Sequence, residues 1–315
     1  MTSFANWSTQ KLFTMNGEDY KMATTYSNIL SDSFGAVRRL SINRPERLNA
    51  LSHGPGSVHD ELNKAMVEAD GDDDVRCIVI TGVGRAFSSG GDTRADRTEM
   101  PSLTRWEGGT RHTAWDSYVF HEDEDSDMEL VRNLHKPVIA MINGMCYGAG
   151  LIYAAHCDLR VASDQARFSL IEGRMGASGV DVFPFIIGIQ WSKFLMLTGE
   201  IISAKKAKEI GLVLEVIPHE ELWPRTLDLA TRIAAMPRFG VMLNKRNVDG
   251  TADMMGWAAN SRFSRSHKAI LEAMDEHAET ADGRKLRSIM AEEGFDAFKS
   301  ARDAPFSTPW IREDD

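Results

Sequence analysis

Short apolar runs with β-type composition alternate along the chain with segments in which apolar residues recur at helical spacing. The densest run covers residues 138–155. Its β-branched start predicts a buried strand over 138–142, and Asn143 and Gly144 predict the turn that ends it. Residues 148–150, Gly-Ala-Gly, then leave the backbone uncovered where a helix should begin. Because N–H groups in the first turn of a helix lack intrahelical acceptors and the helix dipole is positive there, this stretch favours a site for negative charge.

The rest of the chain repeats this alternation. Apolar β-rich runs predict further strands over residues 29–31, 36–42, 75–81, 158–162, 166–170 and 212–217, with a turn over 32–35. Helical spacing predicts helices over residues 56–68, 184–198, 204–210 and 224–234. The strand over 75–81 runs into a second glycine-rich loop over 82–92. Repeating strand and helix units of this kind indicate an α/β fold.

The two ends of the chain differ from this core. After Pro237 nothing is strand-like, and the charged helical pattern predicts a separate helical layer whose longest helix covers 252–278. The N-terminus has no continuous apolar core of signal-peptide type and carries acids that a transit peptide would avoid. We therefore predict an N-terminal extension over 1–25, a core over 26–237 and a C-terminal helical region over 238–315.

Composition limits the possible partners and the compartment. The formal net charge of -10 argues against a nucleic-acid partner, which normally requires a basic surface. Cys77, Cys146 and Cys157 lie in apolar surroundings without a CxxC pair, so buried thiols in a reducing, cytoplasmic setting are favoured over disulfides or zinc. The apolar run over 138–155 follows Pro137 and is interrupted by glycines, which favours a buried soluble segment over a membrane span.

The segment over 94–136 is the least regular. It combines an acidic run with tryptophan, tyrosine and phenylalanine residues. This composition fits either a mobile cover over a pocket or a solvated loop and helix.

Four motifs, in this order, carry a family resemblance. They are RPERLNAL over 44–51, ITGVGRAFSSGGD over 80–92, KPVIAMINGMCYGAG over 136–150 and CDLRVASDQARFS over 157–169. In register, they resemble the crotonase (enoyl-CoA hydratase/isomerase) superfamily over about residues 29–306. The sequence GFDAFKSARDAPF over 294–306 is similar to the closing helix of that family.

The resemblance implies a fold and a shared chemistry. The fold is an α/β, crotonase-like spiral of repeated β-β-α units with a C-terminal helical region that packs subunits into homotrimers, often paired into homohexamers. The chemistry binds an acyl-CoA thioester and stabilises its enolate-like oxyanion with two backbone N–H groups, which fall at Gly91 and Ala149 here. Coenzyme A enters as part of the substrate, and no prosthetic group or metal is implied. Small residues let the thioester oxygen reach prearranged backbone donors; alternatively, Gly-Ala-Gly only permits close helix packing.

Glu172 falls where the resemblance places one of two catalytic glutamates. A carboxylate partly removed from water can move a proton at the carbon next to the thioester; the alternative is an ordinary loop glutamate. The second glutamate of the hydratases corresponds to Ile152, which cannot move a proton. Two-glutamate water addition would therefore lack one of its carboxylates, and superfamily members with one carboxylate include double-bond isomerases.

Other candidates lie near the predicted pocket. Asp181 is close to the position of an extra catalytic aspartate in some superfamily members, or it is the N-cap of the following helix. His112 and His121 lie in the segment over 94–136 and either reach the pocket or remain on the surface. The resemblance places the coenzyme A contacts at Arg47, Ala50, Ser89, Arg94, Phe298 and Lys299. Arginine suits phosphate through its planar fork of donors, although each arginine alone is also compatible with a solvated surface charge.

The sequence thus predicts an enoyl-CoA hydratase/isomerase, a lyase or isomerase of fatty acid or aromatic acid metabolism. One alternative is a C–C bond hydrolase of the retro-Claisen type, acting on a β-diketone or a β-keto acyl-CoA with help from Asp181 or a histidine. Another is a non-catalytic homologue. Retention of Glu172 and of both glycine-rich loops argues against the last.

Overall fold

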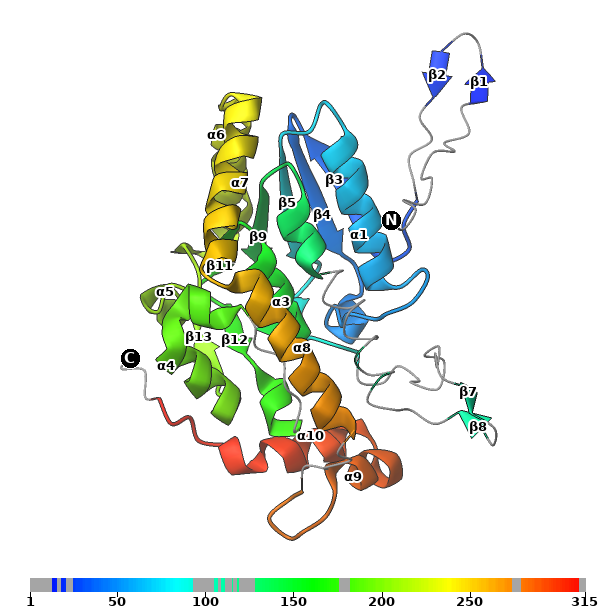
Figure 1. The fold of residues 1–315 in the computed structure, drawn as a ribbon, viewed down its shortest axis with the longest axis vertical. Coiled ribbons are helices and arrows are strands. Elements are labelled where there is room, and N and C mark those ends of the chain that lie inside the picture. The colour runs from blue at the N-terminus through cyan, green and yellow to red at the C-terminus, as the bar shows by residue number, and fades with distance from the viewer. Residues whose placement is uncertain are drawn as a thin grey trace.

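The computed structural model describes residues 25–92, 128–175, 182–273 and 279–311, together with 13–15, 18–20, 105–106, 109–110, 115 and 118. The isolated short pieces include two small hairpins, formed by β1 (Phe13–Met15) with β2 (Glu18–Tyr20) and by β7 (Arg105–Trp106) with β8 (Gly109–Thr110). The longer ranges contain the sheets and helices of the core (Figure 1).

Two sheets form the centre of the molecule. The larger has the order β14-β11-β9-β5-β4-β3 and is parallel except for the β3 and β4 pair. Its strands are β3 (Ile29–Phe34), β4 (Val37–Ile42), β5 (Cys77–Gly82), β9 (Val138–Ile142), β11 (Leu159–Ser163) and β14 (Glu215–Ile217). The smaller has the order β13-β12-β10-β6 and is built from β6 (Ala86–Ser88), β10 (Met145–Tyr147), β12 (Arg167–Ser169) and β13 (Ile202–Ser203).

The helices of the described ranges connect the strands of the core and form the C-terminal region. They are α1 (Val58–Gly71), α3 (Ala149–His156), α4 (Phe183–Thr198), α5 (Ala204–Glu209), α6 (Leu222–Ala235), α7 (Arg238–Met254), α8 (Trp257–Ala273), α9 (Leu286–Glu293) and α10 (Phe295–Asp303). Short 3₁₀ turns are η1 (Pro45–Arg47), η3 (Ile171–Met175), η4 (His219–Glu221) and η5 (Ala304–Phe306). A further helical segment covers 128–133.

The strands pass from one sheet to the other in a regular way. β5, β9 and β11 of the larger sheet are each followed by a strand of the smaller sheet, and then by a helix: the segment over 128–133, α3 and α4. The corners are tight, since a Cβ at Gly144 would lie 2.1 Å from the carbonyl oxygen of Arg85. Three successive β-β-α turns confirm the predicted spiral.

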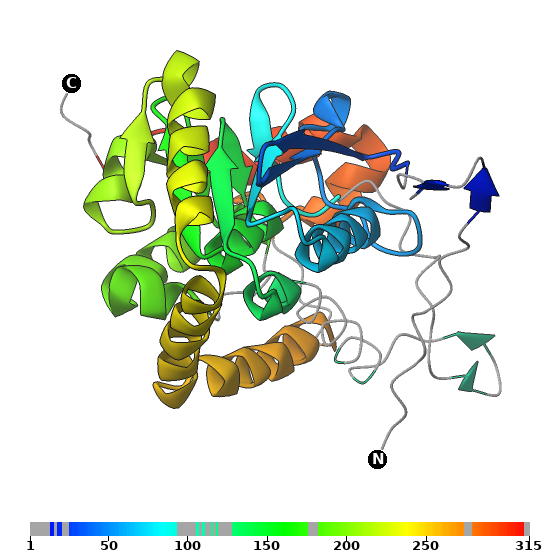
Figure 2. The same ribbon diagram turned by 90° about the horizontal axis from the view of Figure 1, so that it is seen from above.

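Helices cover both faces of the larger sheet (Figure 2). Alternate strand residues point to opposite faces, so Ile78 and Ile80 pack in the core that includes α1 and α3, whereas Cys77 and Val79 pack against α6. Strands buried on both faces read as continuous apolar runs, which is why the β5 and β9 predictions are confirmed.

Some element boundaries differ from the predictions. Asp32 and Ser33 belong to β3, because they pair with Arg39 and Arg38 across the hairpin and the turn is confined to 35–36. The long helix over 252–278 is wrong: Gly256, at a φ of +107°, separates α7 from α8. A left-handed residue of this kind ends a helix at little cost only when it is glycine.

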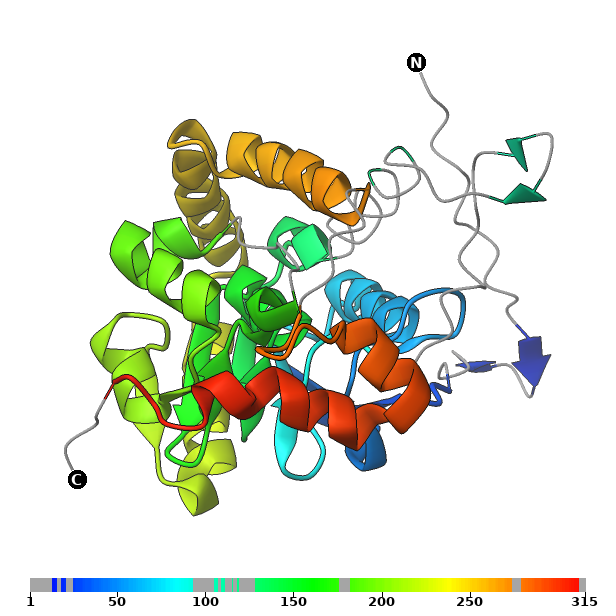
Figure 3. The same ribbon diagram turned by 90° about the horizontal axis from the view of Figure 1, so that it is seen from below.

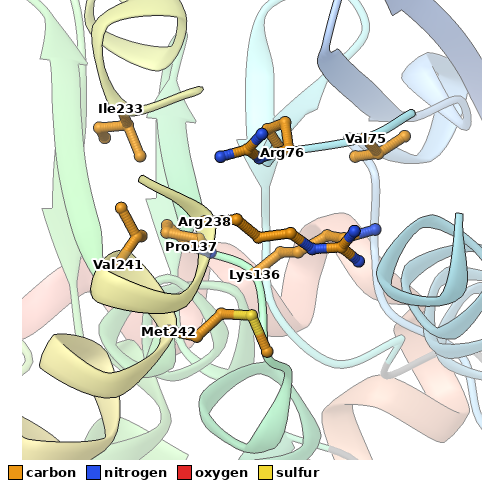
Figure 4. A pocket seen from close by; sticks show the side chains of 8 residues that line it. All are labelled: Val75, Arg76, Lys136, Pro137, Ile233, Arg238, Val241 and Met242. Atoms are coloured by element: carbon orange, nitrogen blue, oxygen red, sulfur yellow. The ribbon is translucent and has the colours of Figure 1, made fainter. Parts of the chain in front are cut away.

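A small cavity of about 10 Å³ lies where the core meets α7 (Figure 4). Three cations line it, but each has partners: Lys136 Nζ donates to the carbonyl oxygen of Ala69 at 2.8 Å, Arg76 to that of Met236 at 2.8 Å, and Arg238 pairs with Asp73 at 2.9 Å. Burial lowers the pKa of Lys136. These contacts hold the end of α1, the segments before β5 and β9, and the α6–α7 corner together. The cations that line the cavity therefore serve the packing of these elements.

Candidate active site

The loop after β6 presents the first predicted donor. Ser88, fully buried at the end of β6, accepts a hydrogen bond at its Oγ from Gly90 N–H at 3.1 Å, and Gly90 has a φ of +97°. Leu51 N–H donates to Gly90 O, and Asp92 N–H donates to Leu51 O, both at 2.8 Å. Since these two bonds use the groups on either side of Gly91, its own N–H points away from Leu51.

The RPERLNAL motif, residues 44–51, supports the loop after β6 through side-chain contacts. Asn49, completely buried, donates from Nδ2 to the carbonyl oxygen of Ala86 at 2.7 Å and accepts from Arg44 N–H at 2.9 Å. The Arg44 guanidinium donates to Ala50 O at 2.9 Å and forms an ion pair with Asp92 at 3.2 Å. The side chains of Arg44 and Asp92 are only 19% and 9% exposed, so the pair is shielded from water. Sequence reasoning did not identify these supporting contacts.

The start of α3 provides the second predicted donor. Gly148 is its N-cap at a φ of +51°, and Gly148 N–H donates to Ser169 O at 2.9 Å. A Cβ at Gly90 would lie 3.4 Å from the nitrogen of Ala149, and a Cβ at Gly150 would lie 2.6 Å from the Cβ of Ser88. The missing side chains therefore let the β6 loop and the α3 N-terminus touch. Within the described residues, neither Gly91 N–H nor Ala149 N–H donates to a backbone carbonyl.

Glu172 lies beside these donors. It belongs to η3, directly after β12, and a Cβ at Gly148 would lie 3.0 Å from its Oε2 atom, which is buried. The structure thus brings Gly91, Ala149 and Glu172 to the carboxyl ends of β6, β10 and β12, three neighbouring strands of the smaller sheet. The arrangement can hold a carbonyl oxygen that gains negative charge and move a proton next to it.

Ile152 stands one helical turn after the donor end of α3. Its side chain is 7% exposed and lies in the apolar core cluster. His156 follows one turn later, 5% exposed, and donates from Nδ1 to the carbonyl oxygen of Ile152 at 2.9 Å, because a carbonyl can only accept. This face of α3 therefore carries no carboxylate.

The other predicted residues fall into three groups. Arg47 is exposed, Ala50 is buried and Ser89 is half-buried with its N–H donating to Leu48 O at 2.9 Å, so all three lie on or beside the loop that supports Gly91. Phe298 is buried on α10 against Leu286, Ile289 and Met175, and Lys299 beside it is exposed. Arg94, His112, His121 and Asp181 lie outside the described residues.

The three thiols are all buried, and they are unsuited to nucleophilic chemistry. Burial raises the pKa of Cys77 and of Cys157 to about 12, and it raises the pKa of Cys146 well above its ordinary value. Across the described ranges, no group of three or more His, Cys, Asp or Glu side chains is arranged to hold a metal ion. None of the helices in this part of the chain is long and apolar enough to cross a membrane.

Comparison with known proteins gives consistent results. A family model described as enoyl-CoA hydratase/isomerase matches residues 33–308. A probable enoyl-CoA hydratase, echA12, of Mycobacterium bovis is 35% identical over 221 residues, which cover 67% of this chain and 73% of the relative. The 1,2-epoxyphenylacetyl-CoA isomerase of Escherichia coli is 31% identical over 228 residues, covering 70% of this chain and 81% of the relative. The crystal structure of an enoyl-CoA hydratase/isomerase from Xanthobacter autotrophicus Py2 superposes with a TM-score of 0.79 at 28% identity, over 90% of this chain and 100% of that one.

Proposed function

Because the chain belongs to the enoyl-CoA hydratase/isomerase family and is an enzyme that processes acyl-CoA, we propose that Gly91 and Ala149 hold the thioester oxygen while Glu172 moves the proton at the α-carbon. The observation that carries this proposal is the joint placement of these three groups at the ends of β6, β10 and β12. Two backbone donors fixed in advance stabilise the enolate without reorganisation in the reaction step.

Among the described residues, Glu172 is the carboxylate placed beside the two donors and Ile152 occupies the position of the second one, which favours isomerisation over hydration. Glu172 takes a proton from the α-carbon of a 3-enoyl-CoA, and the electrons of that C–H bond move toward the thioester oxygen. The carboxylic acid then returns the proton at the γ-carbon, and the double bond shifts to the α,β position. Hydration would need a further group to activate water, and Ile152 cannot do so.

The test uses the purified protein with trans-3-hexenoyl-CoA, crotonyl-CoA and a β-keto acyl-CoA, with products followed by mass. Isomerisation leaves the mass unchanged and moves the double bond, hydration adds one water, and C–C hydrolysis releases a free acid. Turnover of the 3-enoyl-CoA above that of the other two supports the proposal. Release of a free acid as the main product would favour the retro-Claisen alternative, and lack of any turnover would favour a non-catalytic homologue.

Ile152→Glu should create the missing second carboxylate. We expect crotonyl-CoA hydration to rise about tenfold or more, since a positioned general base contributes roughly 10²–10⁴-fold and part of this is lost to imperfect placement. Ile152→Gln is the matched control, because it adds polarity and similar length without basicity. Hydration that stays at the wild-type rate in the glutamate variant would show that Ile152 is not what limits water addition.

Subunit packing is part of the same proposal. Large apolar side chains are exposed along the C-terminal helices, among them Phe239 at 73% and Leu243 at 64% on α7, and Phe263 at 66% on α8. A homotrimer or homohexamer would bury such side chains. Light scattering at micromolar concentration should give three or six times the chain mass of 35.1 kDa, and a monomer mass would contradict it. We further propose that coenzyme A enters as part of the substrate and that the enzyme uses no prosthetic group. We also propose a cytoplasmic location, because three buried free thiols fit a reducing compartment.

A further inference from the structure

The C-terminal helix α10 crosses the lower side of the core (Figure 3). It packs on η3, the turn that carries Glu172. The contact centres on Asp303, the last residue of α10. We propose that Asp303, held between Arg174 and Arg302, is a positioning residue that fixes η3 and thereby Glu172. This inference rests on the proposed role of Glu172.

Arg174 ties η3 to its surroundings. Its side chain is only 4% exposed, its Nη1 donates to Asp303 Oδ1 at 3.3 Å and its Nε donates to the carbonyl oxygen of Thr198 at 3.1 Å. The guanidinium carbon lies 4.0 Å from the ring centre of Phe306 in η5. A buried guanidinium needs its counter-ion, because an unpaired buried charge is strongly destabilising. Asp303 is the carboxylate that pairs with it.

Arg302 holds Asp303 in place. Its Nε and Nη2 each donate to one carboxylate oxygen of Asp303 at 2.9 Å, and its side chain is 9% exposed. Its Nη1 also lies 3.8 Å from the sulfur of Met175, and Met175 is the last residue of η3. A bidentate pair of this kind fixes direction as well as distance. Within α10, Arg302 thus fixes the Asp303 carboxylate that pairs with Arg174 of η3, and it also contacts η3 directly through Met175.

The backbone around η3 is too tightly packed for it to shift independently. A Cβ at Gly199 would lie 2.8 Å from Cγ of Arg174, and a Cβ at Gly173 would lie 2.4 Å from the carbonyl oxygen of Met196. Glu172 directly precedes Gly173 and Arg174, the two residues of η3 that make these contacts. Movement of Arg174 would consequently be passed to the carboxylate that faces Gly148.

The two arginines keep Asp303 in its charged form. Desolvation raises the pKa of Asp303, but hydrogen bonds and charges from Arg302 and Arg174 outweigh it, so the pKa is lowered. Asp303 therefore stays ionised at neutral pH, and its contribution to stability is lost only as the pH falls through this lowered value. Burial raises the pKa of Tyr147 of β10, and the charges of Arg167, Arg174 and Asp303 have smaller effects on it.

Asp303→Asn tests the proposal in the full-length protein with trans-3-hexenoyl-CoA. We expect kcat to fall about tenfold with KM within about twofold, since a small misplacement of a reacting group is costly. The acid limb of the pH profile of kcat should also move to lower pH, because Arg174 is then uncompensated near Glu172. Asp303→Glu should recover most of kcat. Asp296→Asn, an exposed change on the same helix, is the matched control and should behave as wild type.

Arg302→Gln tests independently in which direction the acid limb of the pH profile moves. It can be used even if the Asp303→Asn variant does not fold. Removal of a positive charge should move the acid limb to higher pH, opposite to Asp303→Asn. Wild-type kcat and an unshifted limb in Asp303→Asn, or an unshifted limb in Arg302→Gln, would overturn the positioning role. Failure of the proposed function looks different, because Glu172→Gln would then retain wild-type turnover whatever the Asp303 variants do.

Discussion

Glu172→Gln is expected to lower kcat for trans-3-hexenoyl-CoA about 10³-fold while leaving the affinity for acetyl-CoA within about twofold. Glutamine has nearly the same shape and keeps the packing of η3 against Gly148, but it cannot accept a proton. Loss of a positioned general base typically costs about 10²–10⁴-fold in rate. Steady-state kinetics and calorimetric titration with acetyl-CoA measure the two quantities separately.

Glu200→Gln is the control for this change. Glu200 is 6% exposed and accepts a hydrogen bond from Trp310 N–H at 3.1 Å, so it is also a buried, bonded carboxylate, but it belongs to the contact of the C-terminal segment. Its variant should keep kcat within about twofold of wild type. A Glu172→Gln variant with half or more of the wild-type kcat would rule out Glu172 as the proton carrier.

Gly90→Ala should lower kcat about 10²-fold or more. The added Cβ would lie 2.9 Å from the carbonyl oxygen of Tyr147 and 3.4 Å from the nitrogen of Ala149, so the β6 loop must move away from the start of α3. This separates the two proposed donors, and removal of one oxyanion donor costs roughly 10²–10³-fold in kcat. The measurement is kcat with trans-3-hexenoyl-CoA, together with the urea midpoint to record the change in stability.

Gly54→Ala is the control that separates the effect of backbone strain from the effect of the Cβ collision expected in Gly90→Ala. Gly54 has a φ of +95°, close to the +97° of Gly90, but a Cβ there would meet nothing within 4 Å. Both variants strain the backbone similarly, and only Gly90→Ala pushes the donor loops apart. Equal losses of kcat in the two variants would refute the proposed contact between the β6 loop and α3.

The sequence predicted the long, two-sided strands and the amphipathic helices well. β5 and β9 are continuous apolar runs, and α1 shows Val58, Leu62 and Met66 on one buried face, as its spacing indicates. The sequence did not predict β6 and β10, because a three-residue strand inside a glycine-rich loop is too short to show an alternation of apolar and polar residues. The strands β6 and β10 form through long-range pairing, because β10 bonds to β6 on one side and to β12 on the other.

The site could be predicted only in part. Motif positions selected Gly91, Ala149 and Glu172 as candidates, and the structure places them at the ends of three neighbouring strands; their catalytic roles stay predictions. The ion pair of Arg44 with Asp92 joins residues 48 positions apart, and that of Arg174 with Asp303 joins residues 129 apart. No local pattern encodes such pairs, because they depend on which surfaces meet after the chain has coiled.

The order of the smaller sheet has a consequence for how activity can change. Each proposed catalytic group leaves from the end of a different strand, and these strands belong to three successive turns of the spiral. A substitution in one turn of the spiral can therefore displace one proposed group while the other two keep their places at their own strand ends. The three groups can thus diverge one at a time.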